Sequence, residues 1–127
     1  MTDTPLTLRA LRGATTASAN TAAAMSAAVD ELLDALIAEN GLEGERVLTA
    51  TFSVTADLNA LFPASLARRR PGWDGVALLD CQQMQVEGDL VRCIRVLVQA
   101  WMPAHQAVSH PYLRDAARLR PDRSGHN

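Results

Sequence analysis

Residues 90–102 read LVRCIRVLVQAWM, and this stretch decides how the rest of the chain is arranged. Its apolar, β-branched composition predicts a strand, which Pro103 ends because proline cannot donate a ladder hydrogen bond. Arg95 stands in the middle of this strand. Burying an unpaired guanidinium is costly, so folded proteins provide it with an anion. The sequence leaves two sources open: a carboxylate of the chain such as Asp80, on a neighbouring strand, or a bound ligand.

Outward from this strand, hydrophobic periodicity predicts further strands and two helices. One helix covers residues 20–39, capped by Asn20, and the other covers residues 63–70, with Pro63 in its first turn. Residues 110–119 fit either a helix or a strand. The remaining strands are residues 8–12, which end at Gly13, residues 46–54 and residues 76–79. This order predicts an α+β fold, a mixed β-sheet packed with helices.

The composition indicates one soluble domain over residues 1–127, with residues 1–6 as a loose leader and 121–127 as a flexible tail. The net charge of −2 gives no general electrostatic footprint for a nucleic acid. The apolar stretches are too short to cross a bilayer, and we expect no secretory signal. We therefore expect a cytoplasmic protein with neither a nucleic acid nor a membrane as its partner.

Some kinds of chemistry are excluded or disfavoured by residue type and spacing. All twelve basic residues are Arg, which rules out a catalytic Lys. Cys81, Cys93, His105 and His110 are spaced too widely for a zinc finger or ribbon. Ser109 precedes His110, but no nucleophile-elbow pattern accompanies them, and we expect His110 to bond the backbone near the site. No metal and no cofactor are predicted.

Arg12 and Arg120 repeat the placement of Arg95 on an apolar segment, and three such arginines indicate a pocket for an anion. The segments around them resemble, in order and spacing, the monofunctional trimeric chorismate mutases. The similarity covers nearly the whole chain after residue 8. Its motifs are LRGATT at 11–16, TADLNALFPA at 55–64, GW at 72–73, CIRV at 93–96, HPYL at 110–113 and LRPD at 119–122.

The resemblance implies a homotrimer with a pseudo-α/β barrel, and active sites in the clefts between subunits. The implied reaction is the rearrangement of chorismate to prephenate. The residues that match one wall of the family's cleft are Arg12, Arg95, Tyr112 and Arg120. Those that match the wall from the adjacent subunit are Phe62, Ala64 and Arg68, and Ser65 and Leu79 fall near further pocket positions of that subunit.

The chemistry of this reaction suits these residues. Chorismate is a dianion, and its [3,3] shift needs no nucleophile, metal or proton transfer. Negative charge gathers on the ether oxygen as its bond lengthens, so a cation fixed there stabilises the transition state more than the ground state. We expect Arg95 to be that cation and Arg12 to hold a substrate carboxylate. The remaining expected roles are a hydroxyl donor in Tyr112, rim charges in Arg68 and Arg120, and exclusion of water by Phe62 and Leu79.

The chain departs from the family pattern in the segment after the third strand. The family usually carries a Cys and, three residues on, a Glu. Here Asp80 stands at the Cys position and Gln83 at the Glu position, while Cys81 is shifted by one and is expected to face away. One hypothesis is that the carboxylate has moved to Asp80, on the strand face that points to the site. The alternative is a diverged, non-catalytic or weakly active trimeric relative that binds a chorismate-like dicarboxylate.

Overall fold

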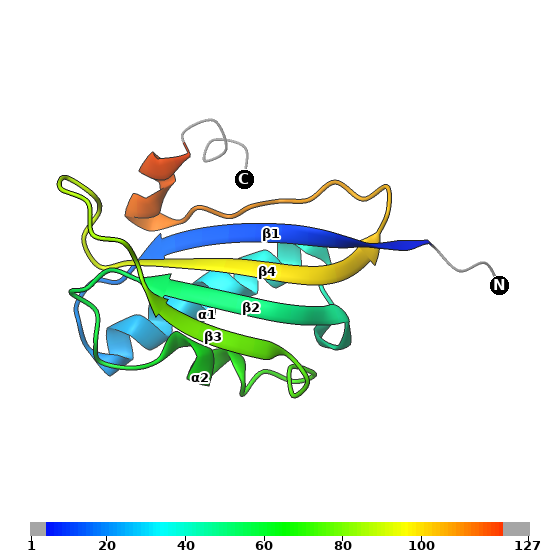
Figure 1. Cartoon of the computed structure of the whole chain (residues 1–127), viewed down its shortest axis with the longest axis horizontal. Helices are drawn as coiled ribbons and strands as arrows, with labels where there is room; N and C mark the ends of the chain where they lie inside the picture. The colour runs from blue at the N-terminus through cyan, green and yellow to red at the C-terminus, as the bar shows by residue number, and fades with distance from the viewer. Residues whose placement is uncertain (1–4, 121–127) are drawn as a thin grey trace.

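A computed structural model describes residues 5–120, which form a four-stranded mixed sheet with helices packed against it (Figure 1). The strand order is β1-β4-β2-β3, with β4 antiparallel to both neighbours and β2 parallel to β3. The predicted α+β class is confirmed. The elements are β1 (Leu6–Thr16), α1 (Ala22–Asn40), η1 (Gly44–Arg46), β2 (Val47–Val54), α2 (Pro63–Ala67), β3 (Ala77–Gln82), β4 (Cys93–Pro103) and η2 (Arg114–Leu119).

Strand β4 sorts its side chains onto two faces by their alternation. Ile94, Val96 and Val98 are buried in the core with the apolar side of α1, which covers this face of the sheet (Figure 1). The intervening residues point to the opposite face, where Leu97 and Trp101 stay 42% and 43% exposed. Arg95 lies on this open face with them. It is therefore half-exposed rather than inside the core.

The start of α1 differs from the prediction by one residue. Thr21, not Asn20, is the N-cap, and its hydroxyl accepts a 3.0 Å hydrogen bond from the Ala24 amide. The Asn20 side chain instead donates to Oδ1 of Asn59 at 2.8 Å and accepts from the Asn59 amide at 2.9 Å. The Asn20 side chain has the chemistry of a helix cap, but its hydrogen bonds to Asn59 leave it unavailable for capping.

Strand β1 is longer than predicted at both ends. Leu6 pairs with Pro103 and Thr16 with Cys93, so the strand starts inside the expected leader and does not end at Gly13. Gly13 is needed for close packing instead: a Cβ there would lie 2.9 Å from a methyl group of Leu32. The long partner strand β4 explains the extension, because every added β1 residue gains a ladder partner.

Strand β4, in contrast, starts at Cys93 rather than at residue 90. Arg92 has a φ of 48°, a left-handed conformation that a strand cannot contain. The ambiguous segment 110–119 combines two structures, since Tyr112 forms a single parallel bridge with Ala14 and η2 follows. The expected flexible tail, residues 121–127, lies outside the described residues. No helix within residues 5–120 is long and apolar enough to span a bilayer.

Candidate functional site

Arg12 and Arg95 come from adjacent strands and share the open face of the sheet. Arg12 lies opposite Leu97, and Arg95 lies opposite Ala14, two residues further along. Diagonal neighbours of this kind have their Cα atoms about 7–8 Å apart. Within residues 5–120, the Arg12 guanidinium has neither a hydrogen-bond nor an ion-pair partner. Two cations held this close repel each other unless an anion lies between them.

Tyr112 reaches the same place because residues 110–113 run along the free edge of β1. The Ala14 amide donates to the Pro111 carbonyl at 3.0 Å, and the Leu113 amide donates to the Ala14 carbonyl at 2.8 Å. The Arg12 amide donates to Nδ1 of His110 at 2.9 Å, which confirms the backbone role expected for His110. Tyr112 is buried against Ala14 as a result.

Arg12, Arg95 and Tyr112 line one pocket of about 190 Å³, together with Thr51 and Ser53 of β2. The structure thus brings three predicted residues of one wall to a common cavity. Nε of Arg95 is buried and has no hydrogen-bond acceptor within the described residues. A cationic donor of this kind fits a ligand anion, which supplies the missing acceptor.

Cys93 does not neutralise Arg95. Burial raises the pKa of the Cys93 thiol and outweighs the opposing influence of the Arg95 guanidinium beside it. The thiol therefore stays uncharged near neutral pH and packs as a small apolar group. The positive charge of the pocket is left for other groups to balance.

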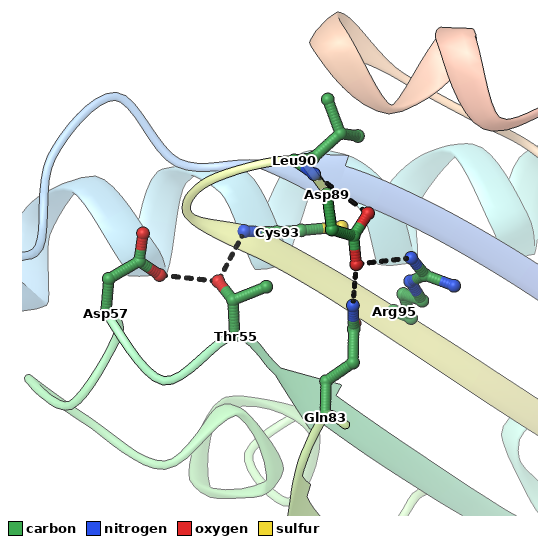
Figure 2. Close-up of polar contacts among 7 residues, drawn as sticks. All are labelled: Thr55, Asp57, Gln83, Asp89, Leu90, Cys93 and Arg95. Atoms are coloured by element: carbon green, nitrogen blue, oxygen red, sulfur yellow. Dashed lines mark hydrogen bonds and ion pairs between the residues drawn. The ribbon is translucent and has the colours of Figure 1, made fainter. Parts of the chain in front are cut away.

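The carboxylate that pairs with Arg95 is Asp89, not Asp80. Oδ2 of Asp89 lies 3.6 Å from Nη2 of Arg95, and it also accepts a 2.9 Å hydrogen bond from Nε2 of Gln83 (Figure 2). Sequence reasoning missed Asp89 because it stands in the turn after Gly88, outside any strand pattern. The only signal was an acidic residue within the segment that joins two strands.

The expected strand faces of Asp80 and Cys81 are the reverse of those observed. Asp80 lies opposite Phe52, a fully buried core residue, whereas Cys81 lies opposite Ser53, which in turn lies opposite Arg95. Asp80 therefore points away from Arg95 within one chain. The prediction that Asp80 shares the face of Arg95 is wrong, because pairing with the core residue of β2 sets the face of β3.

Asp80 instead supports the start of α2. Its Oδ1 accepts a 3.0 Å hydrogen bond from the Ala64 amide in the first turn of the helix. Phe62 occupies the N-cap position, and its side chain has no oxygen that could accept this bond. Burial raises the pKa of Asp80, and the Ala64 amide and the Arg68 charge oppose this shift. Ionised Asp80 thus costs stability above its folded pKa, and that cost is relieved as pH falls toward its unfolded value.

Two substitutions at Asp80 separate these effects. We expect Asp80→Ala to lower the free energy of unfolding by about 1–2 kcal/mol, because the Ala64 amide loses its acceptor. Asp80→Asn keeps the acceptor, so it should match or exceed the wild type at pH 7, with the difference shrinking as pH falls toward 4. Urea unfolding at both pH values measures this. An Asp80→Asn variant as unstable as Asp80→Ala contradicts the assignment.

Phe62, expected on the second wall, lies in a different part of the molecule from Arg95. Phe62 and Asp80 line a separate cavity of about 570 Å³, and Phe62 is 72% exposed. Ala64 is buried, and Ser65 donates to the Phe62 carbonyl at 2.6 Å. None of the residues lining this cavity also lines the pocket of Arg95. Within the described part of the chain, Phe62 and Asp80 therefore lie apart from the pocket of Arg95.

The remaining predicted residues lie around these two places. Leu79 is 58% exposed on the open face, opposite Thr51. Arg68 is exposed directly after α2, and Arg120 is half-buried directly after η2. Gln83 follows β3, and its buried Oε1 has no donor within residues 5–120. Those residues also contain no cluster of three His, Cys, Asp or Glu side chains that could hold a metal ion.

Comparisons with known proteins agree with this geometry. The family model of chorismate mutase type I matches residues 8–123. Chorismate mutase AroH of Bacillus subtilis is 40% identical over 119 residues, covering 92% of this chain and 93% of the relative. The AroH of Thermus thermophilus is 42% identical over 118 residues, covering 91% and 95%.

A solved structure gives the same result. The chorismate mutase from Clostridium thermocellum superposes with a TM-score of 0.80 at 38% identity, covering 87% of this chain and 99% of that one. Sequence motifs, fold and pocket thus agree along nearly the whole chain. The chain belongs to the chorismate mutase type I family.

Proposed function

We propose that this chain is a chorismate mutase that catalyses the [3,3] rearrangement of chorismate to prephenate, at sites between the subunits of a homotrimer. The observation that carries the proposal is the pocket in which Arg12, Arg95 and Tyr112 meet. Its two guanidinium groups suit a dianionic substrate, and its buried Arg95 Nε lacks an acceptor within residues 5–120. Family membership supplies the reaction.

Arg95 carries the main catalytic role in this proposal. The rearrangement breaks the ether C–O bond while the new C–C bond forms, and electron density collects on the departing oxygen. A guanidinium already in place at that oxygen gains interaction energy as the charge develops and needs no reorganisation. The β4 backbone and the Asp89 ion pair hold Arg95 in place.

The other residues of this wall select and hold the reactive conformer. Arg12 binds a substrate carboxylate, since its guanidinium can make two parallel hydrogen bonds. Tyr112 donates its hydroxyl proton to an oxygen of the substrate. Gln83 offers its free Oε1 as an acceptor for a ring hydroxyl. Arg120 adds positive charge at the rim.

The second wall comes from a neighbouring subunit, with Phe62, Ala64, Leu79 and Arg68. Two observations support this arrangement: Phe62 lines a cavity separate from the Arg95 pocket, and Leu97 and Trp101 are exposed on the open sheet face. Apolar side chains on an open sheet face are covered when a second copy packs there. Asp80 serves this wall by holding Ala64, beside Arg68.

In a cell, the reaction belongs to the branch of aromatic biosynthesis that leads to phenylalanine and tyrosine. We place the protein in the cytoplasm. Its two cysteines, Cys81 and Cys93, are not joined in a disulfide, which is the usual state in a reducing compartment.

The test is turnover of chorismate by the purified protein. We expect chorismate absorbance to decay in the ultraviolet in proportion to enzyme concentration, with prephenate as the product. The alternative of a non-catalytic dicarboxylate binder predicts that chorismate binds, by calorimetry, without any decay above the uncatalysed rate. Binding without turnover therefore contradicts the proposed function, and it favours the diverged relative.

A further inference from the structure

The turn that joins β3 to β4 carries a carboxylate into the site. Asp89 lies in this turn, and its side chain points between Gln83 and Arg95 (Figure 2). Gln83 and Asp89 line a second pocket of about 190 Å³, and Arg95 lines the pocket of Arg12 and Tyr112. The ion pair between Asp89 and Arg95 thus connects the linings of the two pockets.

Both oxygens of Asp89 are engaged. Oδ1 accepts a 2.8 Å hydrogen bond from the Leu90 amide. Oδ2 accepts from Nε2 of Gln83 at 2.9 Å and faces Nη2 of Arg95 at 3.6 Å. The Asp89 side chain is 23% exposed, so solvent screens this cluster less than a surface pair.

The backbone that follows Asp89 is also held. Leu90 packs against the small apolar cluster of Ala14, Tyr112 and Ala116. The Arg92 amide donates to both oxygens of Asp57, at 2.9 and 3.2 Å. Thr55 completes the anchor, since its hydroxyl bonds Asp57 and accepts from the Cys93 amide at 3.0 Å (Figure 2). The carboxylate therefore projects from a turn whose C-terminal side is fixed to neighbouring segments.

Asp89 also determines which atoms of its partners remain available. It engages Arg95 through Nη2 and leaves the buried Nε without a partner in the described residues. It takes the NH₂ group of Gln83, which leaves the buried Oε1 as a free acceptor. One carboxylate thus orients one donor and one acceptor for a ligand.

We propose that Asp89 is a positioning residue, which orients the Arg95 guanidinium and the Gln83 amide and supplies the negative charge that this cluster requires. This inference rests on the proposed function, because it assigns Arg95 and Gln83 to the reaction. The negative charge could stand at either residue 83 or residue 89, since the two side chains are joined by a hydrogen bond. With a carboxylate at residue 83 and an amide at residue 89, residue 89 becomes the donor of this hydrogen bond and residue 83 its acceptor. The cluster keeps one negative charge.

Three variants test this. Asp89→Asn removes the charge without changing the shape, and we expect kcat to fall about tenfold to a hundredfold, because a small misplacement of a catalytic group has effects of this size. KM should change by less. The double variant Gln83→Glu with Asp89→Asn restores the carboxylate, and we expect it to recover at least tenfold in kcat over Asp89→Asn. Glu87→Gln, an exposed charge removed from the same turn, is the control and should match the wild type.

A second readout does not depend on turnover. The Nε–H proton of Arg95, identified in ¹⁵N-arginine spectra by its absence in Arg95→Ala, should exchange with water faster in Asp89→Asn, and the double variant should slow it again. Unchanged kcat and unchanged exchange in a folded Asp89→Asn variant overturn the proposal. So does a double variant no better than Asp89→Asn in both measurements. If the wild type itself fails to convert chorismate, the proposed function fails, and the exchange measurement alone decides the role of Asp89.

Discussion

Arg95→Ala should lower kcat by about a thousandfold or more while the protein still folds. Removing a single neutral donor to a developing oxyanion costs about 10²–10³ in kcat, and Arg95 brings a full charge in addition. The residue is half-exposed on the open face of β4, outside the core that α1 covers, so the fold should not depend on it. Steady-state kinetics with chorismate and the unfolding midpoint in urea measure both parts.

Two further variants define what Arg95 contributes. Arg95→Lys keeps a positive charge but loses the planar fork, and we expect activity between those of the wild type and Arg95→Ala. Arg46→Ala removes an exposed arginine that pairs with Glu43 on the surface, and it should leave kcat unchanged. An Arg95→Ala enzyme within tenfold of the wild type would show that another group carries the developing charge.

Mixing two impaired variants should regenerate activity if each site is shared between subunits. Arg95→Ala disables one wall, and Arg68→Ala weakens the other. If the protein assembles as the proposed trimer, every mixed trimer formed by unfolding and refolding the two variants together contains one interface that joins an intact Arg95 to an intact Arg68 from the neighbouring chain. We expect the refolded mixture to exceed the summed activity of the two variants refolded separately.

The matched control combines two lesions in the same wall. Arg95→Ala refolded with Arg12→Ala cannot produce an intact wall, because both residues line one pocket of one chain. That mixture should show no gain. Equal gain in both mixtures, or none in the first while size-exclusion chromatography with light scattering shows mixed trimers, would contradict a site built from two subunits.

Much of the fold could be predicted from local patterns. The apolar spacing of Met25, Val29, Leu32 and Leu36 defines the buried side of α1, and all four are fully buried. The β-branched run after Cys93 defines β4 in the same way. These predictions succeed because a helix or a strand with one apolar face has few ways to bury it.

The ends of the elements were less predictable, since tertiary partners set them. β1 extends from Leu6 to Thr16 because β4 offers it a partner at every residue, although Gly13 reads as a strand end. Asn20 has the side chain of a helix cap, but Asn59 engages it, so Thr21 caps α1. Neither of these long-range contacts can be predicted from the conformational preferences of the local sequence.

Some features of the site could likewise be predicted from sequence motifs, and others depended on tertiary contacts. Arg12, Arg95 and Tyr112 could be found from the motifs that carry them, and the structure brings all three to one pocket. The face of Asp80 could not be found, because residues 76–82 lack a clean alternation and the pairing with Phe52 decides it. Family membership, the mixed sheet and the arginines of one wall were therefore determined by the sequence itself. Which carboxylate meets Arg95 was decided only by tertiary structure, because Asp89 reaches it from a turn held in place by long-range hydrogen bonds that the Arg92 and Cys93 amides donate to Asp57 and Thr55.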